Sequence, residues 1–154
     1  MIAITTFLGK DVIFNGLKHL SSGIHTMVHY ILTHHDHHNV SERLEALDLV
    51  SKVMTIEAMV EEMQDNVKEK RSHNLALNYV HETIGSIHKE LKQLDEEMKT
   101  HETRWFSSWR EPNADASLLR LHHLKGQLER RVRLFIQIMQ LPSGSGSRAL
   151  EIEI

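Results

Sequence analysis

The fold of this chain is decided by residues 77–109, which read LNYVHETIGSIHKELKQLDEEMKTHETRWFSSW. Apolar residues recur there at alternating steps of three and four, the spacing of a helix with one apolar seam. These residues are Leu77, Val80, Ile84, Ile87, Leu91, Leu94, Met98 and Trp105. His101 stands where the next apolar residue is due. Polar side chains fill most other positions, so the helix needs partners that bury its seam, which is where most helical stability in proteins originates.

Three other segments carry the same heptad spacing. The first begins past Gly9 and has apolar residues at Ile13, Leu17, Leu20, Ile24, Met27 and Ile31. The second runs from Ser41, with Leu49, Val53, Ile56, Val60, Met63 and Val67. The last has Leu118, Leu121, Leu124, Leu128, Val132, Phe135, Ile136 and Met139. Four such stripes with short connections predict an all-α protein, an antiparallel up-down-up-down four-helix bundle with long helices.

The expected turns lie between these stripes. The run HHDHH at residues 34–38 ends the first helix, and the charged stretch 68–74 separates the second from the third. The third helix is expected to stop at Glu111, because the residue before a proline, here Pro112, is pushed out of the helical region.

The bundle is expected to occupy residues 1–141, and a different kind of segment follows. Residues 142–154 contain SGSGS, typical of a flexible Gly/Ser linker, and end in a short tail, RALEIEI. Two interpretations of this tail stay open. It adds a strand to the sheet edge of another chain, or it is an expression remnant.

Composition narrows the function classes. A chain of 154 residues without cysteine forms one domain and has no disulfide, thiolate zinc site or cysteine nucleophile, which suits the cytoplasm. The net charge of -3 gives no general attraction to nucleic acid or anionic lipid, so recruitment to a membrane needs a local patch. We expect neither a transmembrane helix nor a signal peptide. No nucleic-acid partner is expected.

Histidine is abundant, with 13 residues, and four of these lie within one expected turn: His34, His35, His37 and His38. Imidazole binds zinc, copper or nickel, so these four are candidate metal ligands, with Asp36 beside them. The alternative is a solvated surface, because the spacing carries no frame that would hold ligands rigidly. No motif of a phosphate-binding loop, a dinucleotide site, a nucleophile elbow or a zinc protease is present, so we expect no enzyme and no cofactor.

Candidate contact residues for a protein partner or a lipid surface come from three places. Both tryptophans lie in one arginine-flanked stretch, with Arg104, Trp105, Phe106, Trp109 and Arg110 as the candidates. The last helix adds Arg130, Arg131 and Arg133, and the apolar N-terminus adds Ile2 and Phe7. Aromatic and arginine side chains are enriched at interfaces and headgroup boundaries. The alternatives are closure of the core by the tryptophans and a solvated face for the arginines.

The stretch from Arg104 to Arg110, followed by a helix of the form Ala116-x-Leu118-x-x-Leu121-x-x-Leu124-x-x-x-Leu128-x-x-x-Val132-x-x-Phe135, resembles known helical domains. These are the N-terminal four-helix bundles of mixed-lineage kinase domain-like pseudokinases and fungal HeLo-type cell-death proteins, with plant coiled-coil resistance domains as looser relatives. The resemblance implies a module of regulated cell death that oligomerises and, in the executioners, attacks membranes. The chain departs from the pattern in its slightly acidic charge and its few basic residues in the first helix.

The sequence therefore favours a non-enzymatic helical-bundle interaction module, a cell-death executioner or adaptor acting by oligomerisation, membrane association or both. Its partner is a protein or a second copy of itself, with an anionic membrane as a further surface. Two alternatives remain: a structural or scaffold self-assembling protein, and a His-rich metal-binding protein.

Overall fold

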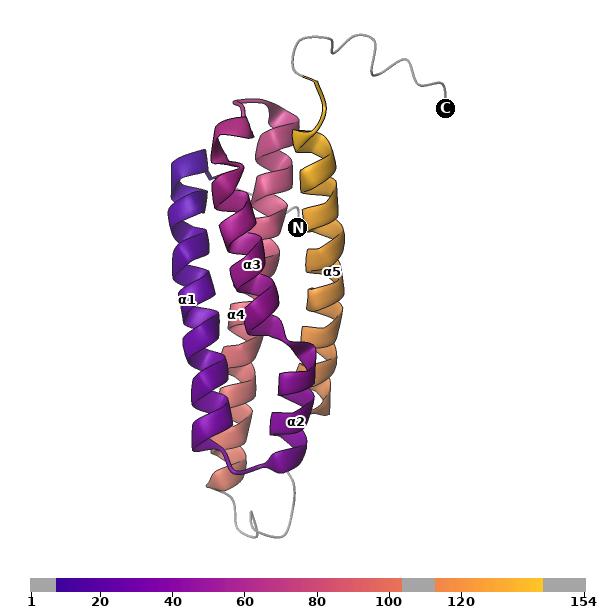
Figure 1. Cartoon of the computed structure of the whole chain (residues 1–154). Helices are drawn as coiled ribbons and strands as arrows, with labels where there is room; N and C mark the ends of the chain where they lie inside the picture. The colour runs from indigo at the N-terminus through magenta and orange to yellow at the C-terminus, as the bar shows by residue number, and fades with distance from the viewer. Residues whose placement is uncertain (1–7, 104–112, 143–154) are drawn as a thin grey trace, which may run out of the picture.

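The computed structural model of this chain describes residues 8–103 and 113–142, and every regular element within them is helical (Figure 1). The elements are α1 (Lys10–His34), α2 (His38–Leu47), α3 (Leu49–Glu62), the short 3-10 helix η1 (Gln64–Asn66), α4 (Arg71–Glu102) and α5 (Asp115–Met139). The prediction of an all-α fold is confirmed. The N-terminal residues 1–7 and the tail, residues 143–154, lie outside the described part of the chain.

The second rod of the bundle is broken into α2 and α3. Asp48 separates them with a left-handed backbone, at φ 50° and ψ 42°, and is the one non-glycine residue with positive φ in the described ranges. Aspartate tolerates this conformation better than most residues. The prediction of one continuous helix from Ser41 to Val67 is therefore wrong at this point.

The longest helix, α4, contacts α1 on one side and α5 on the other. At the beginning of both helices, the backbone N–H of Leu8 donates to Oδ1 of Asn78, 3.2 Å away. At the other end, His35 contacts the side chain of Glu102. The helices α1 and α4 thus lie side by side and run in the same direction.

Contacts between α4 and α5 follow the reverse order. Thr83, early in α4, accepts from Arg131, late in α5, and Glu97, late in α4, accepts from Ser117, early in α5. These two helices run in opposite directions. The two pieces of the broken rod divide the remaining faces, because α3 packs on α1 whereas α2 packs mainly on α5.

The four stripes meet in one apolar core, as the sequence predicts. Ile24, Ile56, Ile87 and Leu128, one from each stripe, are at most 8% exposed and belong to a single cluster of buried residues. Burial of such a side chain contributes about 1.5–3 kcal/mol relative to exposure. The convergence of these residues gives the separate helices a shared centre.

Two glycines of α1 bring this helix close to α4. A Cβ atom added to Gly16 would lie 2.8 Å from Nε2 of His81, and one added to Gly23 would lie 2.8 Å from Nε2 of His88. Real Cβ atoms essentially never approach so closely. Both pairs repeat after seven residues on each helix, as expected for two helices that pack in a heptad register.

The expected turn at residues 68–74 is shorter than predicted, because α4 already begins at Arg71. No glycine or proline stops the helix from extending this far back, and His73 packs in its first turn with only 7% of its surface exposed. Nδ1 of His73 accepts the backbone N–H of Lys68 at 2.9 Å. At its other end α4 stops at Glu102, and residues 104–112 of the predicted third helix and turn lie outside the described residues.

None of the helices found in the described ranges combines the length and the apolar character needed to cross a membrane.

Asp48→Gly is expected to raise the free energy of unfolding by about 0.5–1 kcal/mol, because glycine adopts the left-handed backbone without the strain of a Cβ. Asp48→Val is expected to lower it by about 1–2 kcal/mol, since a β-branched residue fits that conformation poorly. The control is Ser51→Gly, at an exposed position inside α3, which is expected to destabilise. Urea denaturation measures all three, and a valine variant as stable as the parent chain would contradict the break.

Candidate functional site

A buried histidine lies between two carboxylates at the end of the bundle where α1 meets the last turns of α4. His35 is 4% exposed, its Nε2 lies 2.8 Å from Oδ1 of Asp95, and its Nδ1 lies 2.5 Å from Oε1 of Glu102. An ionised carboxylate only accepts hydrogen bonds, so this geometry suits a ring in which both nitrogens donate, the imidazolium form. We call His35, Asp95 and Glu102 the His35 clasp.

The charges of the clasp stabilise one another. Burial disfavours the charge on His35, but the hydrogen bonds to Glu102 and Asp95 outweigh it and raise the pKa of the imidazole above its ordinary 6.5. Burial likewise disfavours the carboxylate of Asp95, but hydrogen bonds from His35 and Lys99 hold its pKa below the ordinary 3.8. The Lys99 ammonium lies 2.9 Å from Oδ2 of Asp95. Both shifts favour the ionised forms of His35 and Asp95.

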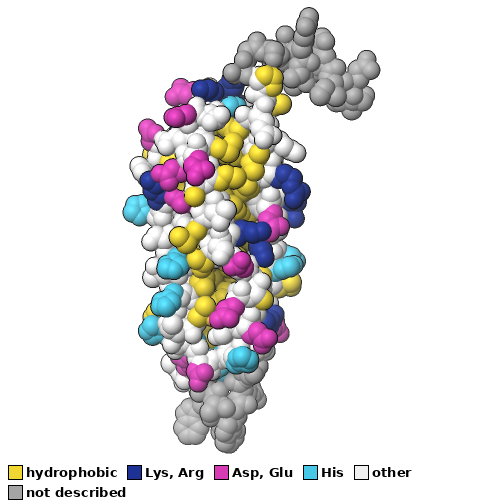
Figure 2. Space-filling view, viewed as in Figure 1, with side chains coloured by type: hydrophobic (Ala, Val, Ile, Leu, Met, Phe, Trp, Pro, Cys, Tyr) yellow, Lys and Arg dark blue, Asp and Glu magenta, His cyan; other side chains and the backbone are white. Residues whose placement is uncertain are grey.

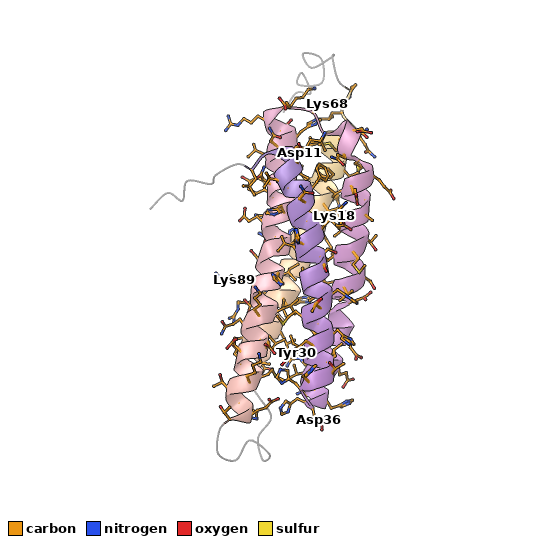
Figure 3. All side chains as sticks on the ribbon, turned by 90° about the vertical axis from the view of Figure 1, so that its left-hand side faces the viewer. Asp11, Lys18, Tyr30, Asp36, Lys68 and Lys89 are labelled. Atoms are coloured by element: carbon orange, nitrogen blue, oxygen red, sulfur yellow. The ribbon has the colours of Figure 1, made fainter. Side chains whose placement is uncertain are left out.

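Aromatic rings surround the clasp. Lys99 lies over the ring of Tyr30, 5.4 Å from its centroid, and Tyr30 stacks on His34 with 4.0 Å between ring centroids. His37 contacts the ring of His101 edge to face, and its Nε2 lies 4.0 Å from Oε1 of Glu102. Figure 3 places Tyr30 at this end of the molecule and Lys68 at the opposite end. The cluster therefore joins the end of α1 to the last turns of α4.

The histidines proposed as metal ligands take separate positions. His35 is buried in the clasp, His34 stacks on Tyr30, and the exposed His38 has its Nε2 3.6 Å from Oε2 of Glu42. Within residues 8–103 and 113–142, no group of three or more His, Asp or Glu side chains is arranged to hold a metal ion. The metal-binding alternative gains no support from these residues.

The three arginines of α5 that the sequence offers as contact residues do not share one role. Arg131 is half-buried, donates to the hydroxyl of Thr83 at 2.7 Å, and lies over the ring of Tyr79, 4.9 Å from its centroid. It anchors α5 to α4. Arg130 and Arg133 are exposed, and Arg133 lines the groove described next.

A groove of about 470 Å³ opens between α3 and α5. Its floor is apolar, with Ile56 and Val132 each 8% exposed and Ile136 half-buried. Figure 2 shows hydrophobic side chains gathered in a strip along this part of the surface. The other lining residues are Asp48, Ser51, Lys52, Thr55, Glu129 and Arg133. The groove exists because the break at Asp48 leaves α3 packed on α1, so that this stretch of α5 lacks the cover that α2 gives lower down.

The remaining candidates from the sequence lie outside the described residues. They are Ile2, Phe7, Arg104, Trp105, Phe106, Trp109 and Arg110. Sequence reasoning missed both carboxylates of the clasp and the groove. A signal for the clasp was present, because His81, His88, Asp95 and Glu102 follow one another at steps of seven and so share one face of α4.

His35→Gln is expected to lower the free energy of unfolding by about 2–3 kcal/mol at pH 6, because it leaves buried Asp95 without one of its two cations. Since the pKa of His35 is raised, its stabilisation is complete below pH 6.5 and is lost as the pH rises through the raised value. The difference between the variant and the parent chain should therefore shrink toward pH 9. Denaturation at several pH values measures it, with exposed His38→Gln as the control. A penalty that stays constant with pH contradicts an ionised clasp.

Comparison with known proteins adds no relative. No protein family, no curated protein and no solved structure matches this chain. The resemblance to cell-death bundles stays a prediction from the sequence, and so do the roles that it implies. The geometry of the described residues is therefore the basis for a functional proposal.

Proposed function

We propose that this chain is a non-enzymatic interaction module that acts by self-association, with the groove between α3 and α5 as the contact surface. In this proposal the described helices form an up-down-up-down bundle whose consecutive rods run antiparallel. The observation that carries it is the groove itself, a depression between α3 and α5 whose floor is formed by the apolar side chains of Ile56, Val132 and Ile136.

The shape of the groove suits a helix. Its walls are two neighbouring helices, and a third helix seated between them would bury the floor at Ile56, Val132 and Ile136. Helix-in-groove contacts are a common way to bind a partner, since one apolar face of the incoming helix meets one apolar depression.

The charges at the rim support a second copy as the occupant. The Lys52 ammonium and the Glu129 carboxylate, 2.5 Å apart, form an ion pair between the two walls. Asp48 on one wall and Arg133 on the other form no ion pair with a described residue. In a two-fold dimer the same surface meets itself, so Asp48 of each copy can face Arg133 of the other. A surface with both signs on opposite walls is complementary to itself.

Sedimentation equilibrium of the full chain tests this proposal. We expect reversible dimers with a dissociation constant in the micromolar range, and Ile136→Lys should raise that constant at least about tenfold, because it puts a charge on the floor of the groove. The matched control is Leu134→Lys, two residues away on α5, where the side chain is 49% exposed and does not line the groove.

A chain that stays monomeric at about 300 µM contradicts self-association, since its affinity would then be weaker than that of an ordinary transient contact. If Ile136→Lys and Leu134→Lys raise the dissociation constant equally, the chain associates through another surface. Circular dichroism of both variants checks that the helices are intact.

The cell-death and membrane-active roles stay predictions from the resemblance. Ile2, Phe7, Trp105 and Trp109, which would contact lipid in that account, lie outside the described residues. Vesicles containing anionic lipid should leak when the chain is added, and leakage should fall when Trp109 is made polar. Absence of leakage at every lipid composition would leave the association module alone.

A further inference from the structure

We propose that α1 is a proton-controlled lid: acidification separates its N-terminal half from α4, while the His35 clasp keeps its C-terminal end in place. This inference is independent of the groove and of self-association. It rests on one stripe of residues on α4. The first two members of this stripe are histidines that face α1, and the last two are carboxylates that bind His35.

The stripe consists of His81, His88, Asp95 and Glu102, at steps of seven along α4. Gly16 and Gly23 of α1 lie against the first two, and His35 bonds to the other two. Every member of the stripe therefore contacts α1 or the residue directly after it. Protons act on the two halves of this stripe in opposite directions.

The upper half of the stripe consists of His81 and His88, nearer to the start of α4, and it requires neutral imidazoles. The imidazoles of His81 and His88 are half-buried against the glycine backbone of α1, and neither forms a hydrogen bond or an ion pair with a described residue. Burial lowers the pKa of His81, and burial with the charge of Lys92 lowers that of His88. Protonation would place two cations in a contact that offers them no anion.

Among the described residues, Lys92 is the charged group that shifts the pKa of either imidazole, and it is a cation. On α1, Lys18 is paired with Glu61 of α3, 2.8 Å away. On α5, Arg131 binds Tyr79 and Thr83, and each of these lies two residues from His81, so both point to the other side of α4. Lys92 of α4 is a further cation near His88. Acid therefore weakens the upper contact, whose stabilisation is present above pH 6.5 and is lost as the pH falls through the lowered pKa values.

The lower half of the stripe consists of Asp95 and Glu102, and it requires a protonated His35. His35 faces Asp95 and Glu102 of α4, with Lys99 bound to Asp95, and His37 lies near Glu102. Its stabilisation is complete below pH 6.5 and is lost only as the pH rises through its raised pKa. Mild acid thus preserves the clasp while it weakens the upper contact.

The first turn of α1 has few other polar anchors. Leu8 donates to Asn78, and the Lys10 ammonium donates to the backbone oxygen of Val67 at 3.1 Å. Ile13, Phe14 and Leu17, each at most 6% exposed, add apolar contacts. Opening would expose these side chains, so the lid would present a new apolar surface in acid.

Hydrogen exchange of the full chain at pH 7.5 and pH 5.0, corrected for the intrinsic rates, tests the proposal. We expect amides of residues 12–22 to exchange several-fold faster in acid, because the lowered pKa values of His81 and His88 make opening easier there, and residues 28–34 to change little. His81→Gln combined with His88→Gln should abolish this increase, because glutamine has a similar length and does not titrate. The control combines His122→Gln with His123→Gln, both exposed on α5, and should open as the parent chain does.

Acid-induced acceleration of amide exchange that is uniform along α1, or absent, would overturn the proposal. The same holds if the double variant of His81 and His88 opens in acid as much as the parent chain does. If that variant does not fold, a magnetic-resonance titration of the parent chain decides. His81 and His88 must then titrate below 6.5 and His35 above it, and the reverse order overturns the lid.

Discussion

The close approach of α1 to α4 is the constraint on which the rest of the structure depends. Gly16 and Gly23 remove side chains where His81 and His88 need room, and the shared step of seven keeps both pairs in register along two helices that run in the same direction. The same register brings the end of α1 to the last turns of α4, where His35 meets its two carboxylates. One contact therefore fixes both the packing and the electrostatics of this face.

The break at Asp48 lets one rod of the bundle cover two helices, α5 and α1. Its first piece packs mainly on α5 and its second on α1, which leaves the groove between α3 and α5. Periodicity predicted the four stripes and their core, because burial of an apolar seam depends on local spacing alone. The break also left a signal in the sequence, since Leu47 and Leu49 are both apolar, and two residues apart in a continuous helix they would point to nearly opposite sides.

The clasp was harder to predict. The sequence places His35 in a polar turn, where a solvated ring or a metal ligand is the natural interpretation, and nothing local indicates burial. Its partner Asp95 lies 60 residues away and belongs to the polar positions of another helix. Whether such groups meet depends on the direction in which neighbouring helices run. The periodicity of a single helix does not predict that direction. The step of seven from His81 to Glu102 became informative only once α1 was known to lie along it.

The most direct test of this account is a double-mutant cycle between Gly23→Ala and His88→Ala, measured as the free energy of unfolding. Gly23→Ala alone should be neutral or destabilising, because the new Cβ meets the imidazole. In the His88→Ala background it should stabilise the chain by about 1 kcal/mol, the ordinary gain of alanine over glycine in a helix. The account predicts a coupling of about 1–2 kcal/mol, and effects that add within about 0.3–0.5 kcal/mol would contradict it.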